Sequence, residues 1–481
     1  MMNQAVVAYK PIRAVWISLA IACFSTLNLQ GQIRISVDSL DLMIHQCLNY
    51  LLEEQQKSTV PDSHFRGEWP SYMQMKTRFV LLGGRKKVYD SNCFALAGTM
   101  NILSDVYRLD SNLKSIPEML RLAYPQLITY RDSSGYNFWP HLKPNGKMRW
   151  KEDSVRTDVL VRRPIQFQIR NTYIRRAANI MNDNDDTAQG MLAEWNYESI
   201  SGATIDRFQN PNFDTYRDTL RDNIHYYNHF ARDPKNSGAY LTWRGDECAF
   251  PTANLVKLLV NNALFLTPRS TAYPFAYEAY MPYGANDVDA IVNANILSTT
   301  ATLSLDSRGT YGASKFIEQK IRRKKWSRAG VYYPNRYQLH YAVIKAWKAG
   351  AISLSNCIAP LVDHIKRTQQ DNGSFESRKI VNQKDRIQST AYALHAMLKL
   401  GNPTETGLEN QINLALHYLI SKSLRQGDNL YWEGGVYFSG GTVIRNTLYW
   451  KSDALTTSII LEALCLLKKY TLEKETKAKQ R

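Results

Sequence analysis

The stretch Gln369–Phe375 reads Gln-Gln-Asp-Asn-Gly-Ser-Phe, and it separates two segments whose apolar residues follow different patterns. Residues 355–370, before it, carry apolar side chains on one helical face and charges on another. The segment after it opens with Ser389-Thr390 and continues as Ala391–Leu394, which is apolar around much of its circumference. Serine and threonine are typical N-cap residues. The pattern therefore predicts an amphipathic outer helix, a glycine–aromatic loop and a buried inner helix.

The same unit recurs at irregular intervals along the chain of 481 residues. The glycine–aromatic loops are Gly67–Trp69, Gly135–Trp139, Gly238–Trp243, Gly330–Tyr333, Gly373–Phe375 and Gly435–Phe438. Amphipathic segments precede them at 37–56, 114–130, 212–231, 311–325, 355–370 and 406–424. Small-residue segments follow them, starting at Asp90–Asn92, Asp183–Thr187, Asn286–Asp289, Pro334–Asn335, Ser389–Thr390 and Ser452–Asp453. Because strand signals are few, we expect an all-α fold, a single (α/α)6 toroid of six outer and six inner helices.

Three connections are longer than ordinary loops, at 57–89, 140–180 and 244–285. They predict extra loops or helices over one end of the ring. The N-termini of the inner helices point toward one end of such a ring. We therefore expect their acidic starts and the aromatic loops to converge on a single cavity.

The run Asp183–Ala188, Asp-Asn-Asp-Asp-Thr-Ala, places three carboxylates in four positions at the start of the second inner helix. Like charges at this range disfavour joint ionisation, so at least one carboxyl can stay protonated near neutral pH. The run either caps the helix and binds a cation or stores a strong acid.

Two motifs resemble one known family. Asp183–Ala188 matches the Asp-x-Asp-Asp-Thr-Ala motif of class II terpene cyclases, the squalene–hopene cyclase group. Gln369–Phe375 resembles the Gln-x-x-x-Gly-x-Trp repeat of that family, with phenylalanine in place of tryptophan. The α-toroid is the fold of that family, so the resemblance extends over most of the chain at the level of repeats.

The resemblance implies an acid-initiated cyclisation of an isoprenoid or other apolar small molecule, without a cofactor or a metal. Asp185 would protonate an alkene or epoxide, and Asp183 and Asp186 would tune it. An alkene is a poor base, so this acid must be strong, must be oriented toward the alkene and must be shielded from water. Aromatic faces would stabilise the carbocations that follow. The candidate substrate-binding residues are Trp243, Tyr283, Tyr332 and Tyr437, with Asp287 and Asp289 at the start of the third inner helix.

Other functions stay open, and so does the question whether the chain is an enzyme. An exported α-toroid that cleaves polysaccharides, as a glycoside hydrolase or lyase, would use two carboxylates separated across a cleft. A non-catalytic toroid would bind a lipid or a glycan and use the acidic run only as a helix cap. His340 and His395 lie in predicted inner helices and are candidates for hydrogen bonding to the acids. The six scattered cysteines signal no zinc site.

The two ends of the chain differ from the predicted toroid at 32–470. Residues 1–31 have the layout of a secretory signal peptide, with cleavage near 22 or 31, and predict export. Residues 471–481 form a basic tail. The net charge of +17 favours an anionic partner and leaves peripheral membrane contact open, but no nucleic-acid module is recognisable.

Overall fold

The computed structural model describes residues 35–61, 63–75, 87–142, 161–162, 180–209, 211–219, 236–244, 286–377, 385–440 and 448–480. The chain divides into Met1–Ser36 and a second unit, Val37–Arg481. The expected signal peptide lies outside the described residues. In the described part, no helix is both long and apolar enough to cross a membrane.

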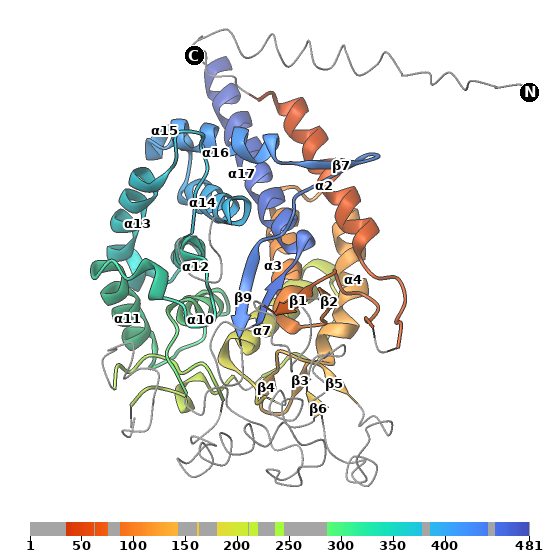
Figure 1. Cartoon of the computed structure of the whole chain (residues 1–481), viewed down its shortest axis with the longest axis vertical. Helices are drawn as coiled ribbons and strands as arrows, with labels where there is room; N and C mark the ends of the chain where they lie inside the picture. The colour runs from red at the N-terminus through yellow and green to blue at the C-terminus, as the bar shows by residue number, and fades with distance from the viewer. Residues whose placement is uncertain are drawn as a thin grey trace, which may run out of the picture. The chain divides into compact units, whose positions relative to one another are not determined.

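Six helices stand side by side and close into a ring (Figure 1). These inner helices are α3 (Cys93–Leu109), α7 (Asn184–Ser201), α10 (Ala290–Thr302), α12 (Arg336–Lys348), α14 (Arg386–Leu400) and α17 (Asp453–Lys479). Each packs against the next in chain order, and α17 packs back on α3. The predicted (α/α)6 toroid is therefore confirmed.

A second set of helices lies outside the ring, one before each inner helix where the chain is described. These outer helices are α2 (Val37–Glu54), α4 (Ser115–Ile128), α11 (Thr310–Arg322), α13 (Ser355–Thr368) and α16 (Glu409–Ser421). The predicted outer helix at 212–231 lies mostly outside the described residues, which include only the short 3-10 helix η1 (Phe213–Thr215) there. Further short helices are α15 (Pro403–Thr406), η4 (Trp326–Arg328) and η5 (Ile352–Leu354).

Polar side chains fix where the inner helices begin. The side chains of Asn92, Asp183, Asp289, Asn335 and Ser452 each accept a hydrogen bond from a backbone N–H in the first turn of α3, α7, α10, α12 and α17. Each satisfies a donor that a helix start otherwise leaves unpaired.

The start predicted at Ser389-Thr390 is wrong, because α14 already begins at Arg386. The hydroxyl of Thr390 instead donates back to the carbonyl of Arg386 at 2.6 Å. This bond to the preceding turn is the other common way to satisfy a threonine, and it belongs to a helix interior.

The glycine–aromatic loop after α13 binds the next outer helix, α16. Gly373 has φ of +83°, and a Cβ there would lie 2.1 Å from the carbonyl oxygen of Leu414. The side-chain amide of Gln369 donates to the carbonyls of Gly373 at 3.1 Å and Gln411 at 2.8 Å. Glycine thus permits the close approach, and glutamine bridges the loop and the helix.

The first loop repeats this arrangement against α4. Gly67 has φ of +94°, and its Cβ would lie 2.2 Å from the carbonyl oxygen of Leu122. The amide of Gln55 donates to the carbonyls of Gly67 at 3.0 Å and Met119 at 2.9 Å. The repeat is therefore one of hydrogen bonding as well as of hydrophobic pattern.

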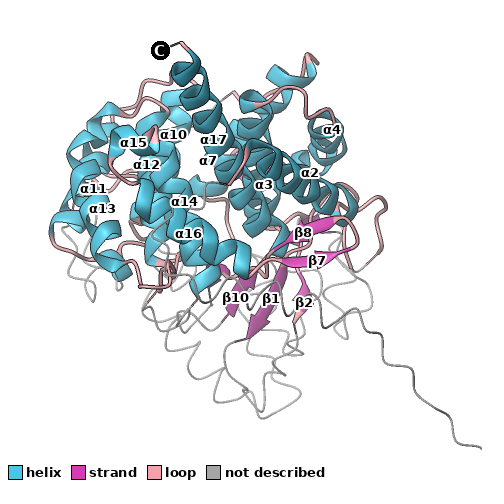
Figure 2. Cartoon of the chain, turned by 90° about the horizontal axis from the view of Figure 1, so that it is seen from above, coloured by secondary structure: helices cyan, strands magenta, loops and turns pink. Residues whose placement is uncertain are grey.

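The described residues also contain ten short strands, which the sequence did not predict, and the strands labelled in Figure 2 lie on one side of the helices. The bounds are β1 (Tyr72–Met75), β2 (Val88–Tyr89), β3 (Arg131–Asp132), β4 (Gly135–Tyr136), β5 (His141–Leu142), β6 (Val161–Arg162), β7 (Leu424–Gln426), β8 (Asn429–Tyr431), β9 (Val436–Gly440) and β10 (Leu448–Lys451). One antiparallel sheet has the order β2-β1-β10-β9, with Tyr72 opposite Lys451. It joins the first repeat to the last and so supports closure of the ring.

Helix α17 extends well beyond the ring's other inner helices. It continues to Lys479, so residues 471–479 of the predicted basic tail are helical.

Candidate functional site

A cavity lies at the end of the ring where the inner helices begin. The described residues that line it are Phe94, Phe138, Trp139, Ile180, Asp183, Asp185, Asp186, Thr242, Trp243, Val292, Tyr332, Tyr333, Phe438, Gly440, Leu448 and Trp450. Its empty space is about 730 Å³, counting the part that opens to solvent. Apart from the three carboxyls, the lining is mostly apolar and aromatic, which is typical of small-molecule sites.

All three acids of the run Asp183–Asp186 line this cavity, and all are buried, with exposed fractions of 5% or less. Asp183 is the N-cap of α7, and its Oδ1 accepts the backbone N–H of Asp186 at 2.7 Å. The carbonyl of Tyr136 accepts the backbone N–H of Asp183 at 3.2 Å. These bonds fix the run at the mouth of the ring.

Asp185, the middle acid, is held from two other elements. The side-chain amide of Asn295, in α10, donates to its Oδ1 at 2.8 Å. The hydroxyl of Tyr333, in the loop before α12, donates to its Oδ2. The carboxyl is therefore oriented within the cavity wall by groups from two neighbouring repeats.

Burial and mutual charge repulsion shift the pKa values of the three acids by different amounts. Burial raises the pKa of Asp183 to about 6, while hydrogen bonds from Asp186 and the charge of Arg244 oppose that rise. Burial, and next the charge of Asp183, raise the pKa of Asp185 well above its usual range. Burial, and next the charge of Asp183, also raise the pKa of Asp186 well above its usual range. Asp183 thus ionises first, and Asp185 and Asp186 retain protons.

Arg244 is a cation whose charge acts on Asp183. It is buried, and its Nη1 donates to Oδ1 of Asn184 at 2.9 Å. Its guanidinium lies 4.8 Å from the ring centre of Tyr216. Since the charge of Arg244 lowers the pKa of Asp183, it stabilises the ionised member of the three acids.

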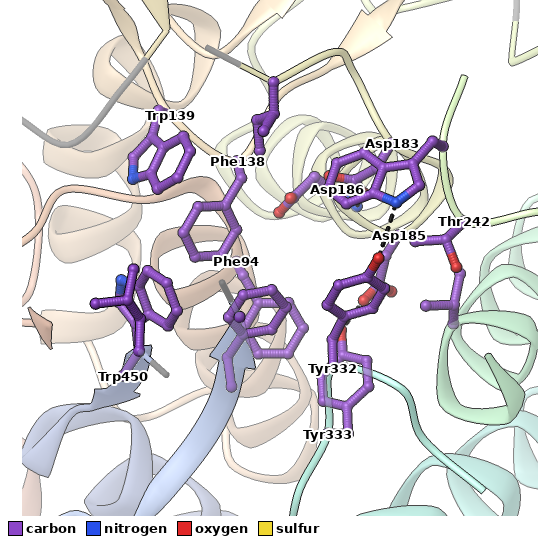
Figure 3. A pocket seen from close by; sticks show the side chains of 16 residues that line it. Phe94, Phe138, Trp139, Asp183, Asp185, Asp186, Thr242, Tyr332, Tyr333 and Trp450 are labelled. Atoms are coloured by element: carbon purple, nitrogen blue, oxygen red, sulfur yellow. Dashed lines mark hydrogen bonds between the residues drawn. The ribbon is translucent and has the colours of Figure 1, made fainter. Parts of the chain in front are cut away.

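Aromatic rings form the wall beside the acids (Figure 3). The indole N–H of Trp243 donates to the hydroxyl of Tyr332 at 2.9 Å, and the two rings meet edge to face. Tyr332 stacks on Phe438 with ring centres 5.8 Å apart. Phe138 also stacks on Phe438, with ring centres 4.8 Å apart. These packed rings present π faces at fixed positions.

The structure brings together most of the residues selected from the sequence. Trp243 and Tyr332 line the cavity with the three acids. Tyr437 is not in the lining; it stacks on Phe94 at 5.6 Å and supports that ring from behind. Tyr283 lies outside the described residues.

Asp287 and Asp289 are buried, but they are not in the described lining of the cavity. Asp287 accepts the hydroxyls of Thr242 at 2.7 Å and Tyr332 at 2.9 Å. Asp289 caps α10 and also accepts the backbone N–H of Tyr332 at 3.1 Å. Both carboxyls therefore hold Tyr332 in place.

The lining also contains residues that sequence reasoning did not select as site residues. Four of them belong to the recurrent glycine–aromatic loops: Phe138, Trp139, Tyr333 and Phe438. The loop repeat was therefore the sequence signal that could have identified them. Trp450 had only one signal, its place two residues before the N-cap Ser452. Asn295, which bonds to Asp185 from α10 but is not in the described lining, had none.

His340 and His395 do not bond to the acids. Nε2 of His340 lies 3.0 Å from Nδ1 of His364 on the outer helix α13. Nε2 of His395 lies 2.8 Å from the Glu462 carboxyl in α17. Both histidines sit several residues inside their helices, away from the N-terminal turns that carry the acids.

No protein-family model and no curated protein matches the chain. Solved structures resemble it in fold. The crystal structure of a protein from Actinoplanes matches with a TM-score of 0.50 and 11% identity, over 90% of this chain and 99% of that chain. Type II terpene cyclase MstE from Scytonema matches with a TM-score of 0.49 and 11% identity, over 91% of this chain and 100% of that chain. A variant of MstE in complex with geranylgeranyl dihydroxybenzoate has the same score and identity, over 90% and 99%. At these identities the likeness is one of fold alone.

Proposed function

We propose that this chain cyclises an isoprenoid substrate, with Asp185 as the acid that protonates an alkene or epoxide. The observation that carries the proposal is the position of Asp185. It is a buried carboxyl in the wall of an aromatic cavity, with a hydrogen-bond donor on each of its oxygens.

The surroundings of Asp185 suit both halves of a proton transfer. Burial and the charge of Asp183 keep the proton on Asp185 before reaction. Once the proton leaves, Asn295 and Tyr333 already donate to the carboxylate that remains. Stabilising this conjugate base makes the acid stronger without any rearrangement.

The other lining residues suit the intermediate that follows. Protonation of an alkene leaves a carbocation, which water would capture. The rings of Trp243, Tyr332 and Phe438 line the same cavity as the acid. Their π faces attract positive charge, and their packing excludes water.

The cavity is less suited to a glycosidase. A glycosidase needs two carboxyls that flank the bond from separate positions. In the described lining, every carboxyl belongs to the one run Asp183–Asp186. A non-catalytic toroid would not need a retained proton on Asp185, so activity separates these possibilities.

The test is incubation in heavy water with squalene, geranylgeranyl diphosphate and geranylgeranyl dihydroxybenzoate, followed by mass spectrometry. We expect a cyclised product that carries one deuteron at carbon, because the acid exchanges with solvent before it protonates the substrate. Asp185→Asn should reduce the rate by about 10³-fold. Glu68→Gln is the control, because Glu68 is an equally buried carboxyl outside the described lining.

Two results would contradict the proposal. One is deuterated product formed at an undiminished rate by Asp185→Asn. The other is cleavage of an acidic polysaccharide by the wild-type protein at a rate that Asp185→Asn leaves unchanged.

A further inference from the structure

A fourth buried acid, Asp90, lies behind the cavity wall. Its exposed fraction is 0%, and it is not among the residues that line the cavity. The indole N–H of Trp450 donates to its Oδ2 at 2.5 Å. The indole N–H of Trp139 is shared between both carboxyl oxygens at 3.3 Å. One carboxyl therefore holds two tryptophans.

Both of these tryptophans line the cavity, and their rings lie on the side away from Asp185 (Figure 3). Phe138 packs edge to face on both of them, with ring centres 5.2 Å from Trp139 and 5.5 Å from Trp450. The two indoles thus place their N–H edges on Asp90 and expose ring surface to the cavity.

No lysine, arginine or histidine pairs with Asp90 in the described part of the chain. The groups that act on its pKa are the indoles of Trp450 and Trp139, Asn92 and the acid Glu68. Among the described residues, no neighbouring cation therefore cancels the effect of a negative charge on Asp90 inside the cavity. Such a charge acts strongly in a dry site, where the effective dielectric constant is low.

An indole attracts cations through its π face, and a carboxylate at its N–H edge increases that attraction by adding negative charge behind the ring. We propose that Asp90 is a positioning residue that orients Trp139 and Trp450 and makes this wall selective for positively charged groups. The inference deepens the proposed function, because the cationic centre of a cyclisation would move away from Asp185 toward this wall.

The protonation of Asp90 is consistent with this role. Burial raises its pKa to about 7, while the two indole N–H groups oppose the rise. A substantial fraction is therefore ionised near neutral pH, and a cation in the cavity would increase that fraction.

The test compares two ligands of the same shape that differ in charge, benzyltrimethylammonium and neopentylbenzene. Their binding to the full-length protein is measured by equilibrium dialysis at pH 7.5. We expect the wild type to prefer the ammonium ion. Asp90→Asn should weaken ammonium binding about tenfold and change neopentylbenzene binding less than about twofold.

Glu68→Gln is the matched control. Glu68 is similarly buried and burial also raises its pKa to about 7, but its carboxyl bonds to Ser91 and Tyr130 instead of the indoles. It should leave most of the ammonium preference intact. If Asp90→Asn does not fold, Trp450→Phe keeps an aromatic ring without the N–H and should also reduce the preference.

The outcomes separate this inference from the proposed function. Equal weakening of both ligands, or no ammonium preference in the wild type, would overturn the role of Asp90 even if the protein cyclises isoprenoids. A charge preference that depends on Asp90, in a protein that forms no cyclised product, would support the inference and count against the proposed function.

Discussion

The hydroxyl of Tyr333 donates a hydrogen bond to Oδ2 of Asp185, across 148 residues of sequence. It joins the loop before α12 to the first turn of α7, so the orientation of the candidate acid depends on a repeat two positions away in the ring. The adjacent Tyr332 makes no such bond; its hydroxyl donates to Asp287 at 2.9 Å.

Tyr333→Phe should therefore weaken the acid while leaving the cavity wall intact. A hydrogen bond to a carboxylate lowers its pKa, so its loss should raise the pKa of Asp185 further. We expect kcat for cyclisation to fall about tenfold, KM to change less than about twofold, and the alkaline limb of the pH–rate profile to move to higher pH. Tyr332→Phe is the control and should leave that limb in place. Equal shifts in both variants would refute the role of Tyr333.

The charge of Asp183 should make folding stability depend on pH. Its pKa is about 6 in the folded chain, against about 3.9 for an unfolded aspartate. A raised folded pKa means that the folded protein loses stability as pH rises through this interval. Asp183→Asn, which keeps an N-cap side chain, should be free of that loss.

We expect the difference in unfolding free energy, variant minus wild type, to be about 2 kcal/mol more positive at pH 7.5 than at pH 4.5. Urea unfolding at both pH values measures it, and the comparison cancels the pH-independent effect on Arg244. Asp363→Asn, at an exposed position on α13, should show a difference of less than about 0.5 kcal/mol. A difference as small as this for Asp183→Asn would show that ionising Asp183 costs no more free energy in the folded protein than in the unfolded chain.

A third prediction concerns the ionic cluster deeper in the ring. Glu462 of α17 is fully buried, and its carboxyl lies 2.8 Å from His395 and 2.7 Å from Lys399, both in α14. Although burial opposes ionisation, these two neighbours hold the pKa of Glu462 well below its usual range. All three lie at least nine residues into their helices, which is about 14 Å from the mouth.

Glu462→Gln should therefore destabilise the protein by about 3 kcal/mol at pH 7, because it removes the buried carboxylate that faces His395 and leaves Lys399 with only the longer contact to Asp105, at 3.5 Å, among the described residues. Glu409→Gln removes an exposed ion pair to Lys474 at 3.4 Å and should cost less than about 1 kcal/mol. Thermal unfolding of both variants distinguishes them. If Glu462→Gln costs no more than Glu409→Gln, the cluster does not stabilise the ring.

Local signals were enough to predict the helical ring. The segment predicted at 355–370 is the helix Ser355–Thr368, because apolar spacing and capping residues act within a few turns. The pairing of Tyr72 with Lys451 was beyond prediction, since nearly the whole chain separates the two strands. Short strands of this kind also carry little periodicity.

The candidate site was predictable only where it follows helix starts. The run Asp183–Asp186 begins α7, and the inner helix starts share one end of the ring, so its place in the cavity follows from the fold. The sequence did not indicate which of the two neighbours Tyr437 and Phe438 lines the cavity. They are successive residues of β9 and face opposite sides, and only Phe438 lines the cavity.

The last prediction tests the glutamine bridges between repeats. The amide of Gln369 donates to two backbone carbonyls, one in its own loop and one in α16. Gln369→Ala would leave both carbonyls without this donor, so we expect the unfolding free energy to fall by about 2 kcal/mol in urea. The adjacent Gln370 is exposed and its amide bonds only to the carbonyl of Thr368 at 3.3 Å, so Gln370→Ala should change stability by less than about 0.5 kcal/mol. Equal effects of the two substitutions would mean that helix propensity and packing hold the repeats together without the bridge.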